Sequence, residues 1–301
     1  MKKPKHIFIV NPKSGNGKAL DTAFLIDELL KDKFEYELIE TKQPDHASEI
    51  ASRYHKKDNV ILYAVGGDGT AYEVLNGLAR DVPMGLIPCG TGNDYMRMFV
   101  HKYKKIKDLI MATVEGDNVL VDYGVANKRR YLNCCCMGID AEVVDHVNRI
   151  SRKYPLPRKL VYMYSAIVKV LHPTRMNASM VIGEEKIDKK VILLTVMNGK
   201  YYGGGFKPAP IASIQDGKFD IVFVDDMKVI QMLGLLPKYF SGKYEGVPQI
   251  HTFFEKKVSL VCDRELLYCC DGEVYSDSKI DFEVVENGLT LRLPKGATIL
   301  Q

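Results

Sequence analysis

The sequence predicts an α/β protein with two domains, an N-terminal doubly wound parallel sheet and a C-terminal antiparallel β-sandwich. Strand-like and helix-like segments alternate over residues 1–122, and short β-rich segments separated by turn residues follow over 123–287. Of the 301 residues, 46% are hydrophobic, which is enough to build a sizeable core in each domain. Whether the last strand, within 288–301, rejoins the first domain is left open.

The first domain begins with the uninterrupted apolar run 6–10, which suits a strand buried on both faces. A helix is predicted over 19–33, and further strands and helices then take turns. The other predicted strands are 35–40, 59–65 and 84–88, and the other predicted helices are 45–57, with Asp45 as N-cap, and 70–80. Such alternation predicts right-handed crossovers, with ligands collected at the carboxyl ends of the strands.

The second domain is predicted from apolar segments at close spacing, which indicate an antiparallel sandwich or barrel. Its predicted strands lie within 119–126, 129–138, 176–183, 189–199, 218–226, 256–263, 265–273 and 279–286, and a last strand is expected over 289–294. Two helical regions interrupt them, 141–171 with a break at 154–159, and 227–239.

Composition excludes several classes of protein. A formal net charge of +4 favours phosphate-bearing ligands or an anionic membrane surface but does not indicate a nucleic-acid binder. The seven cysteines include no Cys-x-x-Cys spacing, so we expect reduced thiols in the cytoplasm and no metal bound by them. No apolar run reaches the roughly 18 residues of a membrane span, so membrane contact is expected to be peripheral and transient. The antiparallel strand edges of the second domain would allow a homodimer to form.

Three glycine-rich turns follow successive predicted strands. In "GGDGT", three glycines surround Asp68, and Thr70 is expected to open a helix. Glycine lets a ligand approach the backbone, and the helix N-terminus favours phosphate. Asp68 would repel phosphate, so its presence implies a magnesium ion between them. The other turns are "NPKSGNGK" (11–18) and "PCGTGNDYMR" (88–97); each alone could be an ordinary turn, but the three together predict a nucleotide cleft.

This ordered set resembles the catalytic domain of the diacylglycerol kinase family, in particular the bacterial soluble lipid kinases, and is similar to sphingosine kinases. The likeness covers nearly the whole chain and continues in "MGIDAEV" (137–143), "NGKYYGGGFKPAP" (198–210), "QDGKFD" (215–220) and "CDGE" (270–273). "GGDGT" alone also occurs in NAD kinases and phosphofructokinases. The resemblance therefore implies that the first domain has the fold of these enzymes.

The resemblance implies a kinase that uses ATP and Mg²⁺ to phosphorylate a lipid hydroxyl, with diacylglycerol or a related lipid as acceptor. The residues that it assigns to the ATP site are Asn11, Pro12, Lys13, Ser14, Gly15, Thr41, Gly66, Gly67, Asp68, Gly69, Thr70, Glu73, Gly90, Thr91, Asn93 and Asp94. Around the catalytic magnesium it implies an acidic, water-bridged network of Asp68 and Asp94. Asp122 either joins this network or is a turn carboxylate at a strand end.

The resemblance also implies three catalytic residues. Asp271 would be the general base, Glu273 would polarise or orient Asp271, and Asp68 would lie beside the phosphates. Asp271-Gly272 is equally a signal for a two-residue hairpin turn, and both interpretations are compatible. The resemblance also implies a structural magnesium held by the Asp216 carboxylate and by backbone carbonyls near Ser213 and Lys218. From the residues alone, a plain turn is preferred there.

The lipid side of the site is less specific. Residues 151–171 combine an apolar helix with Arg152, Lys153, Arg158 and Lys159, and 227–240 is a second candidate for membrane contact. A core-facing helix with a solvated basic end explains the first pattern equally well. The alternative functions are a kinase of another lipid (a sphingoid base or phosphatidylglycerol), an NAD-kinase-like enzyme, and a nucleotide-binding module without catalysis.

Overall fold

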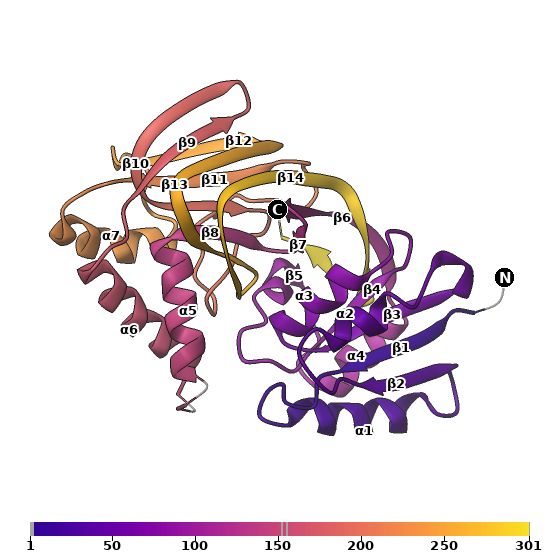
Figure 1. The fold of residues 1–301 in the computed structure, drawn as a ribbon. Helices are drawn as coiled ribbons and strands as arrows, with labels where there is room; N and C mark the ends of the chain where they lie inside the picture. Colours follow the sequence, from indigo (N-terminus) through magenta and orange to yellow (C-terminus); the bar gives the residue numbers. More distant parts are fainter. Residues whose placement is uncertain (1–2, 152, 155, 301) are drawn as a thin grey trace. The chain divides into compact units, whose positions relative to one another are not determined.

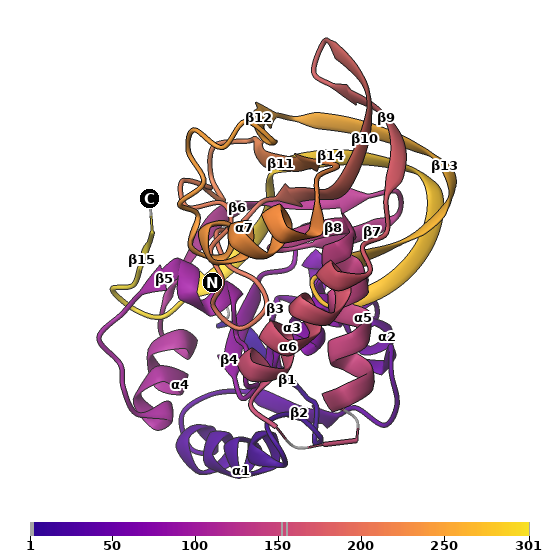
Figure 2. The same ribbon diagram turned by 90° about the vertical axis from the view of Figure 1, so that its left-hand side faces the viewer.

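The computed structural model describes residues 3–151, 153–154 and 156–300, which form two units (Figures 1 and 2). The first unit comprises Met1–Asp122 together with Asn287–Leu300, and the second comprises Tyr123–Glu286. Strand β14, Glu273–Leu293, contributes residues to both. Arg152, one of the basic residues named above, lies outside the described residues.

The first unit is built on a parallel sheet, which confirms the predicted α/β class. Strands β2, β1, β3 and β4 lie side by side in that order, and the end of β14 adds a parallel neighbour beside β4 through Leu291 and Arg292. The strands are β1 (Lys5–Val10), β2 (Tyr36–Glu40), β3 (Val60–Gly66) and β4 (Met84–Pro88). All seven residues of β3 are buried, as expected for a strand covered on both faces.

Helices cover the two faces of this sheet in pairs. Helix α1 contacts α4, and α2 contacts α3, so the chain is wound on both sides of the strands. The helices are α1 (Lys18–Leu30), α2 (His46–Ala51), α3 (Asp68–Gly77) and α4 (Ile106–Val114), with short 3₁₀ turns η1 (Lys56–Asp58) and η2 (Tyr95–Met98). Two short strands, β5 (Phe99–Val100) and β15 (Thr298–Ile299), form a separate pair.

The predicted helix over 45–57 is shorter than expected. Helix α2 ends at Ala51, and Asp45 stands before it with φ 63° and makes no side-chain cap. In this left-handed conformation Asp45 does not have the extended backbone that a capping residue normally adopts. Asp45 thus occupies the predicted N-cap position directly before α2, but its side chain makes no capping hydrogen bond.

A histidine side chain is buried in the core of the first unit. His6 on β1 is buried, with its Nδ1 2.8 Å from the Tyr63 hydroxyl and its ring edge-on to Phe34. Burial lowers the pKa of His6 to about 4, and the positive charge of Arg292 contributes to this shift. The imidazole is therefore neutral in the folded protein near pH 7.

This buried imidazole predicts a loss of stability in acid. In the unfolded chain His6 binds a proton near pH 6.5, whereas in the folded chain it does so only near pH 4. The free energy of unfolding therefore decreases as the pH falls from 6.5 to 4. By pH 4 the loss amounts to about 3 kcal/mol. We expect His6→Leu to remove this part of the pH dependence in urea unfolding measured across the window. His172→Leu, at an exposed histidine, is the control. An unaltered pH dependence of the unfolding free energy in His6→Leu would contradict the lowered pKa of His6.

The second unit consists mainly of antiparallel strands. They are β6 (Asp117–Ala126, shared with the first unit), β7 (Arg129–Tyr131), β8 (Cys134–Gly138), β9 (Met176–Ile182), β10 (Glu185–Met197), β11 (Phe219–Asp225), β12 (Ile250–Glu255), β13 (Lys257–Cys270) and most of β14. The segments 256–263 and 265–273, predicted as two strands, are largely one strand, β13. The polar residues Asp263 and Arg264 lie at an irregularity within that strand rather than at a turn.

Two long strands make this unit sandwich-like. The first half of β10 pairs with β9 and its second half with β8, and β13 divides its pairing between β9 and β8 in the same way. The β10–β11 ladder is irregular between Val191 and Leu193, and the β13–β14 ladder between Val261 and Leu266. Such bulges bend a strand and increase its twist, which lets one strand serve two layers.

Three helices accompany these strands: α5 (Ile139–Ser151), α6 (Arg158–Leu171) and α7 (Val229–Ser241). The predicted break between two helices at 154–159 is thus present. Helix α6 packs against α5 and contacts α7. No helix among the described residues is both long and apolar enough to cross a bilayer.

Candidate active site

The sheet of the first unit has a topological switch point. From β1 the chain passes to β2 on one side and then to β3 on the other, so the carboxyl ends of β1 and β3 flank a natural ligand crevice. Asn11 follows β1, and its Nδ2 donates to the Thr70 hydroxyl at 3.2 Å, beyond the end of β3. Its backbone N–H donates to the carbonyl of Val65. The first two glycine-rich turns therefore meet here.

The loop after β1 is folded on itself by Asn11. The side-chain oxygen of Asn11 accepts the N–H of Lys13 at 3.1 Å. The backbone carbonyl of Asn11 accepts the N–H of Ser14. Gly15 has φ 62°, and a methyl group added there would lie 1.9 Å from the Cys89 carbonyl oxygen. Only glycine fits, so the first turn lies directly against the third.

The second and third turns also approach each other through glycines. The N–H groups of Cys89 and Gly90 both donate to the Gly66 carbonyl, at 2.7 and 3.2 Å. A methyl group on Gly90 would lie 2.5 Å from the Cα of Gly67. Asn93, with φ 49°, closes the third turn by donating from its side chain to the Gly90 carbonyl. All three turns thus converge, as a nucleotide cleft requires.

Two carboxylates lie within this group of turns. Helix α3 begins at Asp68 rather than at the expected Thr70, which places Asp68 in the first turn, where N–H groups lack helical partners. Its Oδ1 accepts the N–H of Asp94 at 2.9 Å, and Asp94 Oδ1 accepts from Arg97 at 3.2 Å. The remaining oxygens approach one point, because a methyl group on Gly92 would lie 2.7 Å from Asp68 Oδ2 and 3.8 Å from Asp94 Oδ2.

These carboxylates fit a hydrated magnesium ion. Mg²⁺ usually takes one or two carboxylates and keeps several waters, and two neighbouring carboxylates offer that donor set. Within the described part of the chain, however, no three His, Cys, Asp or Glu side chains form a metal-binding group. Asp122 is fully buried, and its carboxylate accepts the N–H of Asn287 at 2.7 Å. Its part in the magnesium network stays a prediction.

Three other predicted residues lie around these turns. Thr41 follows β2, and its N–H donates to the Val10 carbonyl at the end of β1. Glu73 accepts the N–H of Ala47 through Oε2 at 3.1 Å, so it joins α3 to the start of α2. Thr91 is exposed at the tip of the third turn.

In the second unit, Asp271 occupies a hairpin tip. Asp271 and Gly272 both have positive φ, 47° and 102°, and form a two-residue turn between β13 and β14. The Asp271 carboxylate accepts three consecutive backbone N–H groups, from Leu132, Asn133 and Cys134. These donors stabilise its negative charge and determine where it points. Glu273, the first residue of β14, is exposed.

The segment that holds Asp271 is itself braced. Asn198 is fully buried and donates from its side chain to the Leu132 carbonyl at 2.7 Å, while its N–H donates to the Asn133 carbonyl. Asn148 on α5 donates to the Gly272 carbonyl at 3.1 Å. Neither role was predicted from the sequence, although Asn198 opens the motif at 198–210.

The predicted structural magnesium site forms a compact turn. Lys218 N–H donates to Asp216 Oδ1 at 3.1 Å, and Gln215 N–H donates to the Ser213 hydroxyl. Asp220, which was not predicted, is buried nearby. Burial, followed by the negative charge of Asp216, raises the pKa of Asp220 to about 7, against an opposing effect of Lys200. A magnesium ion held by this turn stays a prediction.

A second unpredicted acid, Asp140, lies in the core of the second unit. Its Oδ2 accepts hydroxyl groups of Tyr202 at 2.6 Å, Tyr239 at 3.1 Å and Thr195 at 3.5 Å. Burial raises the pKa of Asp140 to about 6, although these hydroxyl groups oppose the shift. The cluster joins α5, β10, α7 and the loop before β11, so we assign it a structural role.

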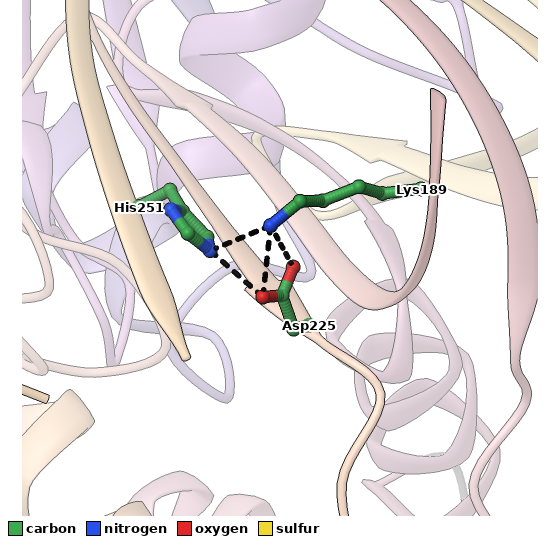
Figure 3. Close-up of polar contacts among 3 residues, drawn as sticks. All are labelled: Lys189, Asp225 and His251. Atoms are coloured by element: carbon green, nitrogen blue, oxygen red, sulfur yellow. Dashed lines mark hydrogen bonds and ion pairs between the residues drawn. The ribbon is translucent and has the colours of Figure 1, made fainter. Parts of the chain in front are cut away.

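An ion-pair cluster crosses three strands of the same unit (Figure 3). Asp225 on β11 accepts from Lys189 on β10 at 3.0 Å and from His251 on β12 at 2.8 Å. Partial burial alone would raise the pKa of Asp225, but the hydrogen bonds of His251 and Lys189 outweigh it and lower that pKa. The His251 ring also stacks on Phe223. The cluster holds neighbouring strands together and includes no predicted site residue.

Comparison with known proteins identifies the family of the chain. The family model of the diacylglycerol kinase catalytic domain matches residues 5–126, and that of the YegS C-terminal NAD kinase beta sandwich-like domain matches residues 133–292. The chain is 28% identical over 291 residues to "Putative lipid kinase YtlR" of Bacillus subtilis (strain 168), covering 89% of this chain and 92% of that protein. It is 26% identical over 252 residues to a "Putative lipid kinase" of Staphylococcus aureus (strain Newman), covering 82% and 81%.

Solved structures show the same fold. The crystal structure of a "putative diacylglycerol kinase" from Bacillus anthracis str. Sterne superimposes with a TM-score of 0.80 at 23% identity, covering 97% of this chain and 98% of that one. The resemblance inferred from the motifs is thereby confirmed, as is the fold class. The chain belongs to the diacylglycerol kinase family of lipid kinases, with the catalytic domain of that family followed by a β-sandwich-like domain of the YegS type.

Proposed function

We propose that the protein transfers the γ-phosphoryl group of ATP to a hydroxyl of diacylglycerol or a closely related lipid. The observation that carries this proposal is the convergence of three glycine turns at the switch point of the first sheet, with Asp68 and Asp94 between them. Glycine backbone and a helix N-terminus suit a triphosphate, and the paired carboxylates suit the cation that accompanies it. The names of the relatives specify a lipid as acceptor.

Each turn has a role in nucleotide binding. Asn11–Gly15 and Gly66–Thr70 line the phosphate site, where the first turn of α3 offers backbone N–H groups, and Thr41, Thr91 and Asn93 add contacts at the rim. Asp68 and Asp94 would hold magnesium, which when bound supplies positive charge to the phosphate oxygens. Because phosphoryl transfer depends mainly on positioning and charge, these residues need to be rigid rather than reactive.

The acceptor hydroxyl must lose a proton as it attacks. In the proposed reaction the hydroxyl oxygen bonds to the γ-phosphorus, the bond from that phosphorus to the β–γ bridging oxygen breaks, and ADP leaves with the electron pair. Asp271 accepts the hydroxyl proton, and Glu273 orients or polarises the Asp271 carboxylate. The three N–H groups bound to the Asp271 carboxylate support this role because they keep it in one orientation.

Transfer of radiolabelled phosphate from ATP to a total lipid extract, with products identified by mass spectrometry, tests the proposal. We expect a magnesium-dependent phospholipid product from diacylglycerol. A product from a sphingoid base, monoacylglycerol or phosphatidylglycerol would redirect the acceptor assignment. Phosphorylation of NAD, or ATP binding without any turnover, would contradict a lipid kinase and favour the other candidate functions.

The lipid acceptor also requires contact with a membrane, and helix α6 supports it. Its inner face buries Val161, Tyr162 and Val170. Its outer face carries large apolar side chains whose exposed fractions range from 45% to 61%. These outer residues are Leu160, Met163, Tyr164, Ile167 and Leu171, a helical stripe that continues from the exposed Tyr154 and Leu156. Such a stripe, with exposed Lys153 and Lys159 beside it, is typical of a helix that lies on an anionic bilayer.

Replacing Leu160 and Ile167 together by serine is expected to weaken membrane binding about tenfold or more, because each large apolar side chain gains about 1.5 kcal/mol or more on burial. Co-sedimentation with vesicles that contain phosphatidylglycerol measures the effect. The matched control is serine at the exposed strand residues Val181 and Val261, which are also apolar and of similar exposure. Equal binding of both double variants would show that α6 does not contact the membrane.

A further inference from the structure

Four of the six cysteines of the second unit form two directly opposed pairs. Strands β8 and β13 are antiparallel, with Cys136 opposite Cys269 and Cys135 opposite Cys270. All four thiols are buried, and the Sγ atoms of Cys135 and Cys270 lie 3.3 Å apart. No disulfide joins them here.

The backbone register favours bridging of one pair. The N–H of Asp271 donates to the carbonyl of Cys134 at 3.0 Å, so Asp271 and Cys134 form a hydrogen-bonded pair. Because the two kinds of pair alternate along an antiparallel ladder, Cys135 and Cys270 occupy the next, non-hydrogen-bonded pair. There the Cα atoms lie about 4.5 Å apart, within the span that a disulfide bridges.

This thiol pair is linked to the Asp271 turn on both strands. Cys270 is the residue before Asp271, and Cys134, the residue before Cys135, donates its N–H to Asp271 Oδ1 at 3.0 Å. A disulfide has an S–S distance near 2.05 Å, so bonding draws the two sulfur atoms together by more than 1 Å. The residues that adjoin the two cysteines are the ones that orient the Asp271 carboxylate, so we expect the movement of the sulfur atoms to disturb them.

Burial protects the pair in the closed protein. It raises the pKa of both thiols, that of Cys135 well above its usual value, so both are protonated and unreactive. Cys270 nevertheless directly precedes the two-residue turn at Asp271 and Gly272, and turns are among the segments that open locally at the lowest free energy. Reaction with an oxidant therefore requires opening of the very turn that carries Asp271.

We propose that Cys135 and Cys270 form a reversible cross-strand disulfide in the presence of a peroxide, and that this bond displaces the Asp271 carboxylate and stops phosphoryl transfer. In the opened turn, one thiolate attacks hydrogen peroxide to give a sulfenic acid and, after proton uptake, water. The second thiol then displaces the sulfenic oxygen as a second water while the S–S bond forms. Two electrons pass from the sulfurs to the peroxide. The inhibition rests on the proposed function, whereas the disulfide does not.

Peptide mapping of the whole protein tests the bond itself. After treatment with hydrogen peroxide and blocking of the remaining thiols, we expect a non-reduced peptide pair that joins Cys135 to Cys270 and is separated by dithiothreitol. Hydrogen exchange at the amides of Leu132, Asn133 and Cys134 is expected to accelerate in the oxidised form, because their acceptor is displaced. Lipid phosphorylation should fall about tenfold or more as the link forms, and recover on reduction.

Variants distinguish this pair from general oxidation. Cys135→Ala and Cys270→Ala should each abolish the link and the peroxide sensitivity, and either one suffices if the other fails to fold. Cys262→Ala is the matched control, because Cys262 is a buried cysteine on the same strand as Cys270 and lies opposite Ala178. This variant should keep both the link between Cys135 and Cys270 and the sensitivity to peroxide. Linkage of Cys136 to Cys269 instead, or no linkage in the folded protein, would overturn the proposal. Linkage without faster exchange at 132–134 would overturn the displacement of Asp271. Absence of lipid phosphorylation from the untreated enzyme would contradict only the proposed function.

Discussion

Asp271→Asn is expected to lower the turnover of lipid phosphorylation by about 10² to 10⁴-fold, the usual contribution of a positioned proton acceptor. The amide cannot accept the hydroxyl proton, and its NH₂ group cannot accept the N–H groups that now meet both carboxylate oxygens. We therefore expect a lower melting temperature as well. Steady-state kinetics with saturating ATP, together with thermal unfolding, separate the two effects.

The control for this prediction lies on the same hairpin. Asp277 on β14 is a carboxylate of the second unit whose partners are Asn127 and the N–H groups of Ser278 and Lys279. Asp277→Asn is expected to retain turnover. Wild-type turnover in Asp271→Asn would exclude Asp271 as the proton acceptor, and loss of turnover with unchanged ATP binding would support it.

Gly90→Ala is expected to lower kcat/KM for ATP about 100-fold. The added methyl group would lie 2.5 Å from the Cα of Gly67 and 2.9 Å from Asn93 Oδ1, so the second and third turns must separate. A displacement of about 1 Å at a phosphoryl-transfer site is enough for a loss of this size. The effect should appear in both ATP affinity and turnover, because the same turns bind and orient the phosphates.

Gly234→Ala is the matched control for this substitution. Gly234 lies within helix α7, and no atom approaches within 4 Å of the position that its methyl group would occupy. Alanine in a helix is favoured over glycine by about 1 kcal/mol, so we expect a slightly more stable protein with unaltered ATP kinetics. Equal ATP kinetics in both glycine variants would show that close approach of the two turns is not needed for binding.

The sequence was most informative where neighbouring residues determine the structure. Strands of the first unit lie close to their predicted positions because uninterrupted apolar runs and glycine turns are local signals. The break between α5 and α6 was predicted for the same reason, from two prolines. Asp45 shows the limit of local reasoning, because it occupies the predicted N-cap position but adopts φ 63°, and its side chain makes no capping hydrogen bond.

Contacts between distant segments could not be predicted in this way. The N–H groups that hold Asp271 come from residues about 140 positions earlier in the chain, and the hydroxyl groups around Asp140 come from three separate elements. The continuity of β13 through Asp263 and Arg264 was missed, since two polar residues suggest a turn unless both neighbouring strands are known.

The fold class, the positions of the glycine turns and the membership of the lipid kinase family follow from residue types at short spacing, so the amino-acid sequence suffices to predict them. The contact of Gly67 with Gly90, the hydrogen bond from the Asp94 N–H to Asp68 and the approach of Cys135 to Cys270 are known only from the folded chain. Strand order and register bring these residues together, and both depend on how the whole sheet buries its apolar faces.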